Sequence, residues 1–81
     1  MRLPRDLSGV ELAKKLEKYG YRITRKTGSH MRLTTQLNGE HYITIPQRKD
    51  LRVGTLSAIL EDVADHLCMG LDELVHEMFG K

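Results

Sequence analysis

The chain has 81 residues, a net charge of +2 and a single cysteine. A chain of this length forms one domain with a small core, so a deep active-site cavity is excluded and chemistry is expected on an exposed face or in a shallow groove. A lone cysteine excludes an intramolecular disulfide, and we find neither a run of about 18 apolar residues nor a signal peptide, so a cytoplasmic protein without a membrane span is expected.

The charge is distributed unevenly along the chain. Residues 1–54 contain twelve Lys or Arg and five Asp or Glu, whereas residues 55–81 contain one and six. A basic first part favours a surface that faces a polyanion. The alternative is that acidic helices at the end of the chain merely keep a basic sheet soluble.

Residues 8–19 are predicted to form a helix. Ser8 and Glu11 have the spacing of a capping box, in which each side chain bonds the backbone N–H of the other residue. An apolar stripe at helical spacing follows, made of Leu12, Ala13, Leu16 and Tyr19. Gly20 is the expected stop after the last turn.

Three segments of alternating polarity, at residues 21–26, 30–35 and 41–45, are predicted to be strands. Since each is half apolar, they form an antiparallel meander with one face on a core. The core face is predicted to carry the apolar members of each strand, Tyr21, Ile23, Met31, Leu33, Ile43 and Ile45. His30 then lies on the polar face.

The lengths of the two hairpin loops follow from this alternation. If Leu33 and Ile43 are cross-strand partners, the second loop has an odd number of residues, most simply 37–39 with Gly39 in the left-handed region. The same reasoning gives the first hairpin a three-residue loop, 26–28 or 27–29, with Gly28 at positive φ.

A second helix follows the basic connection 46–54 and extends to about residue 68. It has the strongest periodic signal of the chain, an apolar stripe of Leu56, Ile59, Leu60, Val63, Ala64 and Leu67. Gly70 ends it, and residues 71–79 form a short third helix. We therefore predict a two-layer α+β fold in a single domain, residues 1–81, with a core at about 8–69 and helices on one face of the sheet.

The order α-β-β-β-α is that of double-stranded-RNA-binding domains, but a fold does not by itself assign a function. His30 is the first candidate for chemistry. An imidazole transfers protons near neutrality, and beside a phosphodiester it can activate a 2′-hydroxyl or protonate a leaving 5′-oxygen while nearby cations stabilise charge. From spacing alone, the alternative is an ordinary exposed strand histidine.

The remaining histidines and the cysteine are expected to be structural. His41 is predicted to cap the edge of the core layer, His66 and His76 to be solvated, and Cys68 to pack beside the apolar stripe. No metal-ligand spacing is found, so no metal and no cofactor is predicted. Scattered carboxylates argue against a two-metal nuclease.

Three segments carry a more specific pattern: "LAKKLEKYGYRITRKTGSHMRL", "YITIP" and "KDLRVGTLSAIL". They place Gly28-Ser29-His30 after a basic first strand, and the ordered set Lys49, Leu51, Gly54, Thr55 and Leu56 before the second helix. In this order, from about Ser8 to about Leu60, the chain resembles the HicA toxin family, also called YcfA-like.

The resemblance implies a small mRNA interferase with a double-stranded-RNA-binding-like fold, the toxin of a type II toxin–antitoxin system. It implies that His30 matches the catalytic histidine of the family and that mRNA is cleaved without a metal, which inhibits translation. The expected partner is a HicB-type antitoxin that blocks the active face. The helix at 71–79 extends beyond the family core.

The predicted site follows from the residues and the resemblance together. His30 is the general acid or base, and Gly28 and Ser29 form the turn that presents it, with Ser29 donating to phosphate. Three cations are predicted to bind RNA: Arg22, Lys26 and Arg32. Arg25 has the parity of the core face and is a weaker candidate. The alternatives are a non-catalytic RNA-binding module, with salt-sensitive binding and no cleavage, and a protein-binding adaptor that uses the acidic helices.

Overall fold

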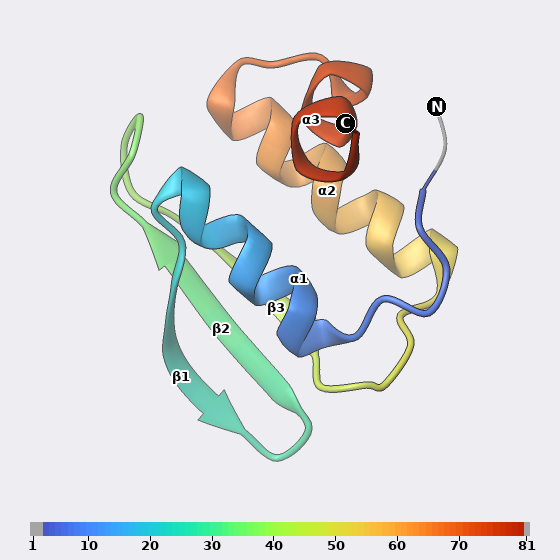
Figure 1. Cartoon of the computed structure of the whole chain (residues 1–81). Helices are drawn as coiled ribbons and strands as arrows, with labels where there is room; N and C mark the ends of the chain where they lie inside the picture. Colours follow the sequence, from blue (N-terminus) through green and yellow to red (C-terminus); the bar gives the residue numbers. More distant parts are fainter. Residues whose placement is uncertain (1–2, 81) are drawn as a thin grey trace.

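An antiparallel sheet covered on one face by helices organises the chain, which a computed structural model describes for residues 3–80 (Figure 1). The elements are α1 (Gly9–Leu16), a 3-10 turn (Glu17–Tyr19), β1 (Arg22–Thr27), β2 (His30–Thr35), β3 (His41–Pro46), α2 (Val53–Leu67) and α3 (Leu71–Phe79). The strand order is β1-β2-β3. The predicted α+β architecture, with a three-stranded antiparallel sheet and a C-terminal helix, is confirmed.

The first helix begins and ends where the sequence predicts. The Glu11 N–H donates to the Ser8 hydroxyl at 3.0 Å, and the Ser8 N–H donates to the Glu11 carboxylate at 2.9 Å. The bond from the Ser8 N–H to the carboxylate, together with the Ser8 hydroxyl, lowers the pKa of Glu11 below its ordinary value. After Leu16 the helix tightens into the 3-10 turn, and it stops at Gly20, whose φ is +84°.

The core lies between the helical layer and the strands β2 and β3. Met31, Leu33 and Ile45 are fully buried, as are Leu12 and Leu56 on the helices above them. The stripe predicted for α2 is buried, except that Leu67 is only partly covered. A Cβ atom on Gly9 would lie 2.1 Å from the Pro46 carbonyl oxygen, so only glycine lets α1 approach the end of β3 this closely.

The second hairpin has the predicted parity and a longer loop. Leu33 pairs with Ile43 as expected, but the last pair of the ladder is Thr35 with His41, which leaves five residues, 36–40, in the loop. Asn38 (φ +59°) is left-handed as well as Gly39 (φ +97°). The predicted three-residue loop is therefore wrong.

The first hairpin also differs from the prediction. Thr27 pairs with His30, so the loop contains only Gly28 and Ser29, and Gly28 has the expected positive φ of +55°. The register shifts between Ile23 and Arg25, where a β-bulge inserts one extra residue into β1. The extra residue that we expected in the turn thus lies within the strand.

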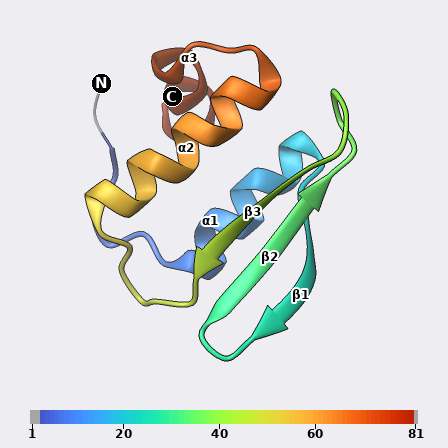
Figure 2. The ribbon, with the colours of Figure 1, turned by 180° about the vertical axis from the view of Figure 1, so that it is seen from behind.

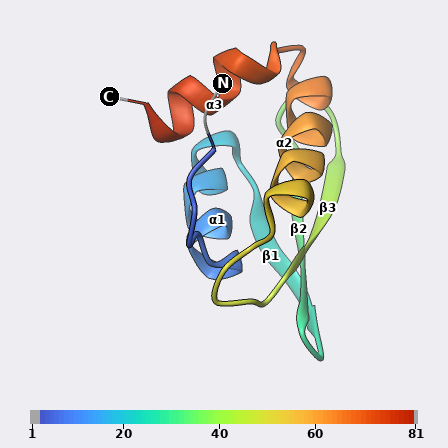
Figure 3. The same ribbon diagram turned by 90° about the vertical axis from the view of Figure 1, so that its right-hand side faces the viewer.

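The edge strand β1 is not part of the core. All six of its residues are exposed, and Ile23, which was predicted to face the core, is 45% exposed. Ile23 shares the face of its buried partner Leu33. However, the buried strand residues come from β2 and β3, and the hairpin formed by β1 and β2 projects beyond the helices (Figures 1 and 3).

The third helix is linked by polar contacts to the 3-10 turn that follows the first helix. The Tyr19 hydroxyl donates to the Glu77 carboxylate at 2.7 Å, and Lys18 lies 3.8 Å from the same carboxylate. Burial, together with this carboxylate, raises the pKa of Tyr19 well above its usual value. Within residues 3–80, no helix is long and apolar enough to span a membrane.

Candidate nucleic-acid interface

The helices leave the other face of the sheet open (Figure 2), and the side chains that the register places on it are mostly polar. Cross-strand partners share a face, so the register assigns its residues. It carries Arg22, Arg25 and Thr27 from β1, His30, Arg32 and Thr34 from β2, and Tyr42 and Thr44 from β3. No carboxylate belongs to this set, so the face presents a positive surface.

His30 is the first residue of β2 and lies at the tip of the projecting hairpin. Its side chain is exposed, and among the described residues no hydrogen bond or ion pair engages its ring. The turn before it is anchored, because the Gln47 N–H donates to the Ser29 carbonyl at 2.6 Å. Both ring nitrogens of His30 are thus free to exchange protons with a ligand on this face.

A shallow hollow of about 170 Å³ surrounds His30. It is lined by Arg25, Thr27, His30, Arg32 and Thr44, which come from all three strands. Two guanidinium groups provide fixed positive charge and forked donors, and two hydroxyl groups provide further hydrogen bonds. This combination suits a phosphate group beside the imidazole.

The structure brings only some of the predicted RNA-binding residues to this hollow. Arg32 lines it, and Gly28 and Ser29 form the turn next to it. Arg22 lies on the same face but pairs with Thr34, farther along the sheet. Lys26 pairs with the buried Met31 and so belongs to the opposite face.

Arg25 takes the place that we had predicted for Lys26. It pairs with Arg32, so the core-face parity assigned to it is wrong. The bulge is the cause, because one inserted residue exchanges the two faces for every residue between it and the turn. The Thr24 hydroxyl fixes the bulge, lying 2.9 Å from the Thr34 hydroxyl and donating to the Arg32 carbonyl at 3.3 Å.

A sequence signal for this arrangement existed. Gly-Ser between two strands is typical of a two-residue turn, in which glycine occupies the first central position. With such a turn, a regular ladder pairs Thr24 with Leu33 and leaves Ile23 opposite Thr34. Keeping Ile23 opposite Leu33 then requires one extra residue in β1, which predicts the bulge.

An aromatic ring lies on the same face and contacts Arg32, which lines the hollow. The guanidinium carbon of Arg32 lies 4.8 Å from the centroid of the Tyr42 ring, which is within the range of a cation–π contact. Tyr42 is 59% exposed, whereas Tyr19 and Tyr21 are buried. The alternation of residues 41–45 predicts Tyr42 on the polar face and assigns it no role.

The other end of the sheet holds a second histidine in a very different setting. His41 Nδ1 lies 2.7 Å from the Tyr21 hydroxyl, and its Nε2 lies 3.2 Å from the Asp62 carboxylate. Because a carboxylate only accepts, Nε2 donates to Asp62, and in the neutral imidazole Nδ1 accepts from the Tyr21 hydroxyl. Burial, with Asp62 nearby, raises the pKa of Tyr21 to about 12, which keeps this donor protonated.

His66 completes this network and is not the solvated residue that we expected. Its ring stacks on His41 with centroids 4.3 Å apart. Its Nε2 donates to the carbonyl oxygens of Leu37 at 2.8 Å and Gly39 at 3.0 Å, so it fixes the second hairpin loop to α2. The prediction that His41 caps the edge of the core is confirmed, with His66 as its partner.

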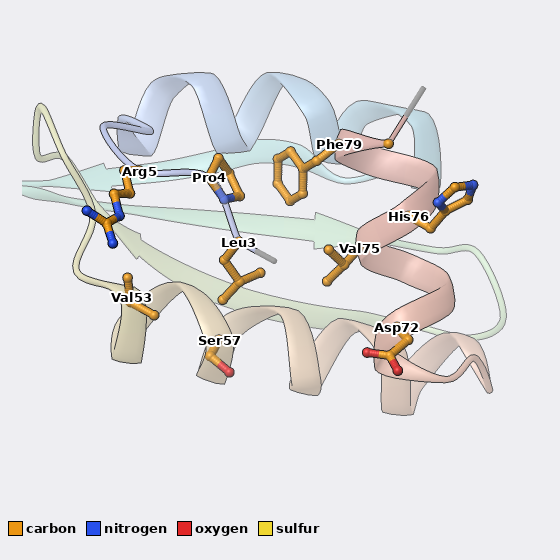
Figure 4. Close-up of a pocket in the computed structure, with 10 residues that line it drawn as sticks. Leu3, Pro4, Arg5, Val53, Ser57, Asp72, Val75, His76 and Phe79 are labelled. Carbon is orange, nitrogen blue, oxygen red and sulfur yellow. The ribbon is translucent and has the colours of Figure 1, made fainter. Parts of the chain in front are cut away.

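A larger hollow, about 1200 Å³, lies on the helical side and shares no lining residue with the hollow at His30. The N-terminal segment at Leu3, the start of α2 at Val53 and α3 at Val75 and Phe79 form its walls (Figure 4). Its lining is mostly apolar, and His76 is the histidine that borders it. It lacks the paired arginines found beside His30.

Neither a metal cluster nor a buried thiol is found in the described part of the chain. No group of three or more His, Cys, Asp or Glu residues between 3 and 80 is arranged to hold a metal ion. Cys68 is exposed and caps the end of α2 in a left-handed conformation (φ +57°), so the prediction that it packs beside the apolar stripe is wrong.

The sequence also matches a model of a known protein family. Residues 9–64 match the family described as HicA toxin of bacterial toxin–antitoxin systems. The match includes the whole sheet and most of α2 and ends before α3. Searches of curated proteins and of solved structures gave no match.

Proposed function

The chain belongs to the HicA toxin family of bacterial toxin–antitoxin systems, and we propose that it acts as an endoribonuclease that cleaves mRNA and inhibits translation. The observation that carries this proposal is the exposed His30 in a hollow that it shares with Arg25 and Arg32. The hollow opens on the face that the helices leave free, where an RNA strand has access. Since mRNA is translated in the cytoplasm, we propose that the protein acts there.

Each residue of the hollow has a proposed role. In cleavage, the 2′-oxygen attacks phosphorus while the bond to the 5′-oxygen breaks, so one proton leaves the 2′-hydroxyl and another reaches the 5′-oxygen. His30 transfers one of these two protons as general base or general acid. Arg25 and Arg32 stabilise the charge that develops on the non-bridging oxygens. The Thr27 and Thr44 hydroxyls orient the phosphate.

Apart from His30, no residue that lines this hollow is suited to transfer the second proton. Besides His30, the lining residues are two arginines, which stay protonated, and two threonines, whose hydroxyls do not titrate near neutrality. We therefore assign the second transfer to water that enters the open hollow. The proposal gives no role to a metal ion or to another cofactor.

Incubation of the purified chain with single-stranded RNA in a metal chelator tests the proposal. We expect the wild-type chain to cleave and His30→Ala to be inactive while its thermal unfolding is unchanged. His76→Ala is the matched control, since it removes an exposed imidazole from α3 and is expected to cleave at the wild-type rate.

Two results would contradict the proposal. Cleavage by His30→Ala at the wild-type rate would show that another group does the chemistry. Salt-sensitive RNA binding by a wild-type chain that never cleaves would favour the non-catalytic RNA-binding module instead.

Membership of a toxin–antitoxin family implies a paired antitoxin, and we propose that a HicB-type protein binds the open face and covers His30. Finding a reading frame for such a protein beside that of this chain would support the proposal. Purified partner should protect the RNA substrate from cleavage.

A further inference from the structure

Tyr42 stands out on the open face because it is a large aromatic side chain among short polar and cationic ones. It is 59% exposed, on a face whose other residues are arginine, threonine, histidine and, at the edge, Pro46. Of the four aromatic residues of the chain, all within the described part, Tyr19 and Tyr21 are buried and Phe79 is partly buried. The core therefore gives no reason for an aromatic ring at residue 42.

The position of Tyr42 relates it to the His30 hollow. It pairs with Thr34, four residues along β2 from His30, which corresponds to about 14 Å at 3.4 Å per residue. Arg32 lies between them, lining the hollow and contacting the Tyr42 ring. A strand whose phosphate sits at His30 would extend past Arg32 and bring a neighbouring base over the ring.

We propose that Tyr42 is a stacking platform for an unpaired RNA base and selects single-stranded over double-stranded RNA. An aromatic ring stacks on the face of any base and so needs no particular sequence. In a duplex each base face is covered by its neighbours, and the ring gains nothing. Arg32 holds the ring in place and joins the stacked base to the phosphate site.

The inference rests on the proposed function in one respect, that the ligand is RNA. The competing explanation is that Tyr42 only packs against Thr34 and Arg32 and stabilises the sheet. The two explanations differ in strand preference. A stacking platform affects single-stranded RNA alone, whereas a structural residue affects both forms of RNA equally.

Binding is measured in the His30→Ala background, so that the RNA is not consumed, by fluorescence anisotropy with a labelled RNA as a single strand or annealed to its complement. We expect Tyr42→Ala to weaken single-strand binding by about 5- to 150-fold and to leave duplex binding unchanged. Tyr42→Phe keeps the ring and should rescue the affinity. Val53→Ala, which removes an exposed apolar side chain from the helical side, is the control.

Equal single-strand affinity with and without the Tyr42 ring would overturn the inference, and so would an equal loss for both RNA forms. A parallel cleavage assay with Tyr42 intact keeps the two proposals apart. Failure to cleave, with the Tyr42-dependent single-strand preference preserved, refutes the nuclease and supports the platform. Cleavage that needs His30, together with binding that does not depend on Tyr42, refutes the platform alone.

Discussion

His30 and His41 begin two adjacent strands, yet they lie at opposite ends of the sheet in opposite chemical settings. His30 is exposed beside two arginines, and no hydrogen bond to its ring is found within residues 3–80. His41 is 20% exposed, and both of its nitrogens have partners, Tyr21 and Asp62. A histidine with both nitrogens engaged stabilises a fold, whereas one with free nitrogens can exchange protons with a ligand.

The surroundings of the two residues extend this contrast. The His41 end is closed by the stacked His66 ring and by the loop at 36–40, which His66 bonds through two carbonyl oxygens. The His30 end is a two-residue turn that projects from the sheet, with open space around Gly28. The His41 end of the sheet is thus held by side-chain contacts, whereas the His30 end is open to a ligand.

The sharpest test of this contrast is the substitution His30→Gln. The His30 change is expected to lower the cleavage rate by about 10²- to 10⁴-fold, the usual contribution of a general acid or base. It should leave the unfolding midpoint unchanged, since no bond within the described chain is lost. Single-turnover kinetics and urea unfolding measure the two effects. A drop in stability with full activity would reverse the assignment.

Removal of Arg25 and of Lys26, one at a time, tests whether the bulge decides which of the two cations acts beside His30. Arg25→Ala is expected to weaken RNA cleavage by about tenfold or more, as for a lost hydrogen bond to a charged group. Lys26→Ala, which removes the same formal charge from the opposite face, should have a smaller effect. The kcat/KM of both variants on one RNA gives the comparison. Equal losses would mean that net charge, and not the register, matters.

At the closed end, His41→Ala is expected to destabilise the fold by about 1–3 kcal/mol, because the buried Tyr21 hydroxyl loses its acceptor. Tyr21→Phe in the same background removes the unsatisfied group and should recover part of the loss. The free energy of unfolding in urea is the measurement, and cleavage by folded protein should persist. Strict additivity of the two changes would show that the residues are not coupled.

The smallest effect is expected at the start of α1. The Gly9 N–H there donates to the carbonyl of Arg48, which follows the end of β3 that pairs with His30. Ser8→Ala removes the N-cap and should cost about 1 kcal/mol of stability with cleavage intact. The lowered pKa of Glu11 means that its part of this stability is present above pH 4.5 and is lost as the pH falls through the folded pKa.

Unfolding of Glu11→Ala and of wild type at neutral and at acidic pH measures the contribution of Glu11. The difference between the two should shrink on acidification, because the protonated Glu11 no longer bonds the Ser8 N–H as a carboxylate. A difference that grows on acidification would contradict the capping box as its source.

The sequence by itself determined what depends on short-range periodicity and local chemistry. The capping box at Ser8, the stop at Gly20, the three strands, the pairing of Leu33 with Ile43 and the exposed face of His30 all followed from spacing. The ordered motifs also led to the HicA toxin family, which the match over residues 9–64 confirms. The roles of individual residues in RNA binding and cleavage stay proposals.

Only the tertiary structure decided which cation lies beside His30 and how the other histidines are used. One inserted residue at the bulge exchanges Arg25 and Lys26 between faces, because side chains alternate with a period of two and a single shift inverts every position up to the turn. The contact of His66 with the loop joins segments 27 or more residues apart. Such contacts leave no local periodicity, so they exist only once the chain has folded.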